Sequence, residues 1–270
     1  MLGAAALYLR AEKNGKLPVF TGRVMHGVFF RTLKNISPEL ADFVHDELSV
    51  KPFSLSELVR LKRYSFHMGN FQVSRGDLFR WRIAAVNDVI LNAIVNIPSG
   101  YRFQVNKIPM VLEKIIVDGD LEKDTGIMSA ENLMAACFSM DDIRSIYVKF
   151  TSHTTFRVNQ SDYPMPVPKL VFSSLADKWQ KAGMPANIDK EQIREISERV
   201  YLSDWKGRSD RVYLSGDRGV KTFTGEFVYE LSDLTIEERQ IMLLLAQFGC
   251  FVGCGRMTGQ GLGQIEIEVR

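Results

Sequence analysis

The glycine-rich stretch "GCGRMTGQGLGQ", residues 253–264, constrains the fold more than any other part of the chain. Apolar residues precede it, and the alternating segment "IEIEV" that follows is typical of a half-buried strand. Glycine tolerates positive φ and lets the backbone approach a ligand closely, so we expect a loop that binds phosphate, from a nucleotide or a nucleic acid. Its glycines include Gly253, Gly255, Gly261 and Gly263.

The common nucleotide-binding loops do not fit this stretch. A dinucleotide fingerprint needs a third glycine where Thr258 stands, and it follows a strand and opens a helix. A Walker loop needs a glycine-lysine pair followed by serine or threonine, which is absent here. Thr235 and Glu238 instead form a capping-box pattern that begins a helix, for which Gly249 is the expected end. The order helix, glycine loop, strand excludes both nucleotide folds.

The first half of the chain mixes strand and helix signals. Apolar periodicity and helix-capping residues such as Thr21 and Ser37 define the expected elements. We expect strands at 3–12, 78–86 and 101–108, and helices at 21–35, 37–48 and 86–96. This βααββαβ order predicts a ferredoxin-like unit with one extra helix.

The second half repeats the theme. A new strand signal begins at residue 143, and helices, two strands, a long helix and a last strand follow. We therefore predict an α+β protein of two tandem ferredoxin-like domains, residues 1–142 and 143–270.

Composition permits nucleic-acid binding only through local patches, because the net charge of the 270 residues is +2. One run of basic residues interleaved with aromatic ones lies between Arg60 and Arg82, and a second lies between Tyr201 and Lys221. Cations for phosphates and rings for stacking are the ingredients of RNA recognition, although a solvated strand face has the same composition. Within these runs we select Arg80, Arg82, Arg208 and Arg211 as candidate RNA contacts.

The three cysteines are too few and too irregularly spaced for a disulfide framework, which favours a reducing compartment, and we expect a cytoplasmic protein. Cys250 and Cys254 lack the further ligands of a zinc site, so buried thiols are expected. No run of about 18 apolar residues predicts a membrane span. Neither a metal nor another cofactor is expected.

The four-glycine loop, with Arg256 in its five-residue gap, resembles the RAMP superfamily of CRISPR-associated proteins. The resemblance is to the endoribonuclease that cuts precursor CRISPR RNA within its repeats. Further similar segments are "GVFFRTLKNISPELADFVHDELSVKPFSLSEL", "SHTTFR", "PVPKLVFSSLADKW" and "FTGEFVYEL". The resemblance implies tandem ferredoxin-like domains, CRISPR repeat RNA as partner, and metal-independent cleavage. The 2′-hydroxyl attacks the adjacent phosphate and leaves 2′,3′-cyclic phosphate and 5′-hydroxyl ends.

The resemblance also implies candidate catalytic residues. His45, in "ADFVHDEL", matches the place of the family's frequent catalytic histidine, and Lys51 matches a lysine that neutralises the phosphate. Phe30 falls where the family often has a tyrosine, and His26, one turn earlier, is the candidate replacement base. The alternatives are a helix-end role for His45, a solvated loop for Lys51 and a core-edge position for His26. We expect structural roles for His67 and His153.

A second reading remains open. A non-catalytic RAMP subunit that binds guide RNA in a CRISPR effector complex would share the glycine loop but would need no histidine at the helix end. Its partners would be the guide RNA and the other subunits of that complex. Both monomer and homodimer are compatible with the sequence.

Overall fold

The computed structural model describes residues 1–44, 52–61, 70–215 and 218–270. They form two compact units: an N-terminal unit of residues 3–127 and 259–261, and a C-terminal unit of residues 1–2, 128–258 and 262–270. The main boundary thus lies near residue 127, not near residue 142. The cause is helix α4 (Ala130–Phe138), which packs on α7 (Ile236–Val252): the Gln240 amide donates hydrogen bonds to the carbonyls of Phe138 and Met140.

An antiparallel sheet in the order β3-β5-β1-β7-β6 forms the centre of the N-terminal unit. These strands are β3 (Phe53–Arg60), β5 (Leu78–Ala85), β1 (Leu2–Ala11), β7 (Ile108–Ile116) and β6 (Arg102–Val105), and the short β8 (Gly126–Met128) pairs with β1. A separate ribbon joins β2 (Gly15–Pro18) to β4 (Asn70–Val73). The predicted strand at 101–108 is in fact a hairpin, because Asn106 turns the chain at φ +55°.

Helices complete this unit. They are α1 (Gly22–Ile36), α2 (Pro38–Asp42) and α3 (Asp88–Val95). The apolar face of α1, with Met25, Phe29 and Leu33, enters the same buried core as Ile90 and Ile94 of α3. The chain order β1-α1-β3-β5-α3-β7, together with the strand order, is that of a ferredoxin-like fold, as predicted.

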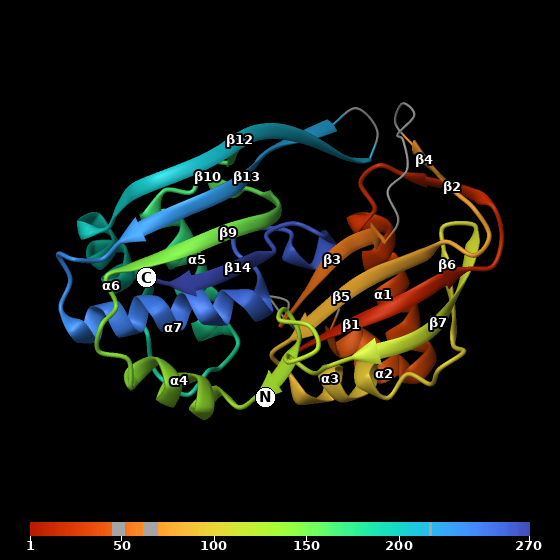
Figure 1. Ribbon diagram of the computed structural model, residues 1–270, viewed down its shortest axis with the longest axis horizontal. Helices are drawn as coiled ribbons and strands as arrows, with labels where there is room; N and C mark the ends of the chain where they lie inside the picture. Colours follow the sequence, from red (N-terminus) through yellow and green to blue (C-terminus); the bar gives the residue numbers. More distant parts are fainter. Residues whose placement is uncertain (45–51, 62–69, 216–217) are drawn as a thin grey trace. The chain divides into compact units, whose positions relative to one another are not determined.

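The C-terminal unit has the same topology. Its antiparallel sheet has the order β12-β13-β9-β14, with β9 (Ser145–Thr154), β12 (Tyr201–Ser215), β13 (Arg218–Glu230) and β14 (Ile265–Val269). Two short strands, β10 (Phe156–Val158) and β11 (Ser161–Tyr163), pair with each other. The helices are α4, α5 (Pro168–Lys181), α6 (Lys190–Ile196) and α7. Figure 1 shows β12 and β13 as a long ribbon at the edge of this sheet.

The predicted helix caps are confirmed in part. Thr235 and Glu238 form the capping box of α7, and the Ser37 hydroxyl accepts a hydrogen bond from the Leu40 amide. Thr21 precedes α1 but its hydroxyl does not cap the helix; it accepts a hydrogen bond from the Leu58 amide of β3. Among the described residues, no helix is long and apolar enough to cross a membrane.

The predicted end of α7 at Gly249 is wrong. The helix continues to Val252 and ends at Gly253, whose φ is +69°. Gly249 serves packing instead, because a Cβ there would lie 2.6 Å from the Ile265 side chain and 3.0 Å from that of Leu175.

Candidate active site and nucleic-acid interface

The glycine loop that follows α7 is held by close contacts within its own unit. A Cβ on Gly255, at φ +78°, would lie 2.5 Å from the Thr155 carbonyl oxygen, and one on Gly263 would lie 2.1 Å from the Cys254 carbonyl oxygen. Real side chains do not reach such distances, so these positions require glycine for the loop to close. The glycine spacing from which we predicted a ligand-binding loop is therefore a requirement of folding, and ligand binding by the loop stays a prediction.

A buried lysine supports the start of this loop. The Lys178 amine of α5 donates hydrogen bonds to the carbonyls of Val252 and Gly253, at 3.3 and 2.8 Å, and to the Thr258 hydroxyl, at 3.3 Å. Burial lowers the pKa of Lys178 to about 8. The amine thus connects the last residue of α7, Val252, with Gly253 and Thr258 of the loop. Sequence reasoning did not single out this lysine, because in the sequence it is one of many helix lysines.

Arg256 projects from the loop and forms an ion pair with Asp162 of β11. Its backbone amide donates to the Thr155 carbonyl at 3.0 Å, which fixes the residue beside the β9–β10 connection. The side chain is 33% exposed, so it remains partly accessible to solvent although it is paired with Asp162. Arg256 is therefore a preorganised cation, although part of its charge is already neutralised.

The middle of the loop, Gly259–Gly261, belongs to the N-terminal unit and packs on the start of α1. His26 Nδ1 lies 2.8 Å from the Gly259 carbonyl oxygen. Since a carbonyl only accepts, Nδ1 carries the proton and donates, which places the lone pair of the neutral ring on Nε2. Gly261 lies against Gly22, where a Cβ would be only 2.7 Å from the Gly22 Cα.

The His26 ring also has fixed aromatic neighbours. Its centroid lies 4.9 Å from that of Phe30 in an edge-on arrangement, and Phe30 in turn meets Phe53 at 6.0 Å. The hydrogen bond to Gly259 and the ring contact with Phe30 both help to fix the orientation of His26. Phe30 supplies no hydroxyl here, and the described structure shows it as a packing residue.

Glu57 of β3 is a second titratable group at this place. Its Oε2 accepts a hydrogen bond from the Thr21 amide at 3.1 Å, and burial raises its pKa to about 7. A Cβ on Gly261 would lie 3.3 Å from the Glu57 Cγ, so this carboxyl group borders the same tripeptide as His26. The sequence signal that could have found it is the single acid in the strand segment "FSLSELVR".

The other expected catalytic residues, His45 and Lys51, lie outside the described residues, as does His67. His153, on β9, is half-buried, and its Nδ1 lies 3.1 Å from the Thr222 hydroxyl of β13. Burial lowers the pKa of His153 below its usual value. The expected structural role of His153 agrees with this strand contact.

Arg80 and Arg82 form ion pairs within the N-terminal unit. On β5 they lie on the sheet face opposite buried Phe79 and Trp81, because side chains alternate along a strand. The acidic segment 118–124 covers that face: Arg80 pairs with Glu122 and Asp124, and the Arg82 Nε donates to the Asp124 carbonyl at 2.7 Å. RNA binding by these two arginines stays a prediction, and it would require these ion pairs to be exchanged.

Arg208 and Arg211 lie on β12, in the long ribbon, and both are exposed. Trp205 of the same strand is 62% exposed, and its ring lies parallel to that of Phe227 with centroids 6.4 Å apart. Exposed guanidinium groups and an exposed indole on one strand are residue types that contact phosphates and stack on bases. RNA binding by Arg208 and Arg211 stays a prediction.

Comparisons with known proteins agree with this picture. Residues 148–265 match the family model of the CRISPR-associated endoribonuclease Cas6. Cas6 of Mycobacterium tuberculosis is 29% identical over 131 residues, which make up 48% of this chain and 41% of that protein. The matched segment thus spans about two fifths of the curated relative.

Solved structures match nearly the whole chain. A Cas6 product complex has a TM-score of 0.78 at 25% identity and covers 99% of this chain and 100% of that one. Thermus thermophilus Cas6 has a TM-score of 0.73 at 25% identity, covering 99% and 98%. The resemblance expected from the sequence is therefore confirmed: this chain is similar to the Cas6 family of CRISPR-associated endoribonucleases, in fold over 99% of its length and in sequence over residues 148–265.

Proposed function

We propose that this chain processes CRISPR RNA by cutting it within its repeats, without a metal ion. The observation that carries the proposal is the match of 99% of the chain to a Cas6 product complex. The preorganised His26 beside the glycine loop and the exposed cations of the β12–β13 ribbon provide supporting chemistry.

The proposed reaction is an internal transesterification. The ribose 2′-oxygen forms a bond to phosphorus and loses its proton to a base, while the bond from phosphorus to the 5′-oxygen breaks. The leaving 5′-oxygen takes a proton from an acid, so the products are a 2′,3′-cyclic phosphate and a 5′-hydroxyl. Groups that titrate near neutral pH suit both proton transfers, and a cation stabilises the charge on the phosphorane.

In this proposal the described candidate base is His26. Its Nδ1 donates to the Gly259 carbonyl, so Nε2 carries the lone pair that can accept the 2′-hydroxyl proton. His45 remains the candidate acid or base from the family resemblance, and Lys51 the candidate cation. Arg256 contributes a positive charge beside the loop, and the four glycines shape it.

The reaction class is tested with a labelled repeat RNA in excess chelator. Cleavage should persist, and a 2′-deoxy sugar on the 5′ side of the cut should abolish it, because the nucleophile is then missing. Loss of activity in chelator alone would overturn the metal-independent mechanism.

The roles of the histidines are separated by substitution. His45→Ala should bind repeat RNA nearly as well as the parent while the single-turnover rate falls by about 10² to 10⁴, the usual effect of losing an acid-base group. His26→Asn is the sharper variant, because its amide can still donate to the Gly259 carbonyl although the second ring nitrogen is gone. His153→Gln is the control that removes a histidine bound to a neighbouring strand.

If His26 is a base, His26→Asn and His26→Ala should both lose cleavage. Recovery of the parental rate in His26→Asn alone would mean that His26 only holds the loop. Tight RNA binding by a parent protein that does not cleave would instead favour the non-catalytic RAMP subunit.

A further inference from the structure

Three turns of the N-terminal unit come together at one end of its sheet. They are the β1–β2 turn, the β4–β5 turn and the β6–β7 turn, and we call this surface the turn surface (residues 10–16, 74–77 and 102–108). The Arg75 amide donates to the Asn14 side chain at 2.8 Å, and the Asn106 side chain donates to the Lys16 carbonyl at 3.4 Å. The three turns thus form one continuous surface.

This surface carries an excess of positive charge. Its basic residues are exposed and comprise Arg10, Lys13, Lys16, Arg75, Arg102 and Lys107. Two of them are neutralised: Arg10 pairs with Glu113, and Arg102 forms a two-pronged ion pair with Glu12. Among the described residues, no carboxylate lies within ion-pair distance of the other four.

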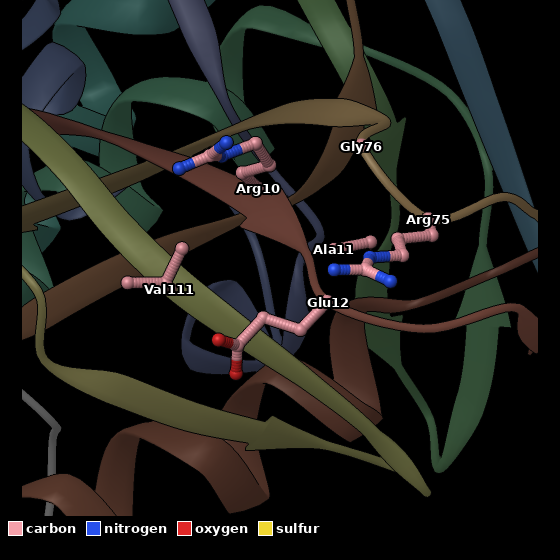
Figure 2. Close-up of a pocket in the computed structure, with 6 residues that line it drawn as sticks. All are labelled: Arg10, Ala11, Glu12, Arg75, Gly76 and Val111. Carbon is pink, nitrogen blue, oxygen red and sulfur yellow. The ribbon is translucent and has the colours of Figure 1, made fainter.

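The surface is also hollowed. A pocket of about 230 Å³ is lined by Arg10, Ala11, Glu12, Arg75, Gly76 and Val111, and Figure 2 shows the two arginines and Glu12 around it. A second hollow is lined by the turn residues that include Lys13, Lys16 and Lys107. Cations that border such hollows can contact an anionic group from more than one side.

The chemistry of the lining favours a phosphate backbone. Protein interfaces and base-stacking sites need exposed aromatic or large apolar groups at their centre. The described lining of the two pockets contains no aromatic ring; of its apolar members, Ala11 and Ile108 are buried and Val111 is partly buried. Unpaired cations without stacking groups suit phosphates and carry no sequence preference.

The position of the surface is consistent with such a ligand. The chain leaves β1 at Ala11, passes through β2 and begins α1 at Gly22. The turn surface and the start of α1, where His26 lies, therefore both follow the carboxyl end of β1. Both belong to the same unit, and residues 17–21 join them along the chain.

We propose that the turn surface binds the phosphate backbone of single-stranded RNA, independently of its sequence, and so holds substrate outside the segment that is cut. The substrate part of this inference rests on the proposed function, whereas the binding of RNA backbone does not. The expected ligand is any single strand long enough to reach the three turns.

The test is the affinity for a uridine 30-mer as a function of salt. A triple variant, Lys13→Ala with Arg75→Ala and Lys107→Ala, removes three phosphate contacts. The slope of log affinity against log salt should become shallower by about 2, because each neutralised phosphate of a single strand contributes about 0.7. The ratio of the parent's RNA affinity to that of the variant should then fall about fourfold for each doubling of the salt concentration.

The matched control removes the same charge elsewhere. Lys169, Lys181 and Arg194 lie on α5 and α6, each paired with a carboxylate, and their triple alanine variant should keep the parental slope. A milder Lys13→Gln, Lys107→Gln variant guards against misfolding, and its slope should change by about 1.4. An unchanged slope in the turn variants, or an equal change in the control, would overturn the proposal.

Cleavage separates this inference from the proposed function. At saturating protein the turn variants should cut a short repeat RNA at the parental single-turnover rate. If the turn variants bind uridine more weakly than the parent but neither they nor the parent cleave repeat RNA, the proposed function is wrong and the proposed role of the turn surface stands. If the turn variants lose only a protein partner and bind uridine like the parent, the RNA assignment is wrong.

Discussion

Gly255→Ala tests whether the glycine loop is built from contacts that only glycine allows. At Gly255 an added Cβ would lie 2.5 Å from the Thr155 carbonyl oxygen, and φ is +78°. That oxygen also accepts the Arg256 amide at 3.0 Å, so moving it breaks a hydrogen bond. The substitution therefore combines a backbone penalty with a steric one.

The two penalties can be separated with Gly183→Ala. Gly183 has a φ of +64°, and a Cβ there would meet nothing within 4 Å. Alanine at a positive φ costs about 1 kcal/mol of folding stability at either site. At Gly255 the lost hydrogen bond and the forced shift add about 1–3 kcal/mol, which gives a total of about 2–4 kcal/mol.

Thermal unfolding, followed by the fluorescence of the three tryptophans, of which buried Trp179 lies in the same unit, measures the difference. With about 2–4 °C lost per kcal/mol for a domain of this size, Gly255→Ala should melt well below Gly183→Ala. Equal melting temperatures would refute the steric argument. A Gly255→Ala protein that melts like Gly183→Ala but loses RNA affinity would show that the glycine serves the ligand and not the fold.

Three further predictions concern charge. Glu57→Gln should be more stable than the parent above pH 7, and this difference in stability should close toward pH 4.5. The reason is that the pKa of Glu57 is raised from 4.5 to about 7, so the parent loses stability as the pH rises through that range. Denaturation at several pH values measures the difference. Arg256→Ala should flatten the salt dependence of RNA binding by about one phosphate contact. Asp162→Asn removes the partner of Arg256 and should tighten RNA binding in the same titration. An unchanged slope of log affinity against log salt in Arg256→Ala would make Arg256 structural. Lys178→Met should cost about 1–3 kcal/mol of stability at pH 7, because it leaves buried carbonyls without a donor. The stability difference from the parent should widen from pH 8 to 10.5, as the parental amine loses its charge. A constant difference in denaturation at several pH values would contradict the lowered pKa.

Local chemistry explains what could be predicted about this fold. The apolar spacing of α1, the Ser37 cap and the Thr235–Glu238 capping box depend on residues within a few positions of each other. The same holds for the glycine spacing, from which the family resemblance followed. Fold class and the order of most elements were therefore predictable, although the end of α7 was not, since Gly249 packs against a distant strand.

The candidate site needed the tertiary structure, because its contacts join distant segments. His26 and the Gly259 carbonyl are 233 positions apart, so no local pattern reveals that hydrogen bond or the tautomer it selects. The sequence does not show that Arg80 is paired, because its partners Glu122 and Asp124 reach it only in the folded protein. The sequence by itself determined which elements form and where glycine is needed, since these depend on neighbours along the chain. Only the tertiary structure decided which charges are paired and which are buried, since partner choice and dehydration depend on segments that meet after folding.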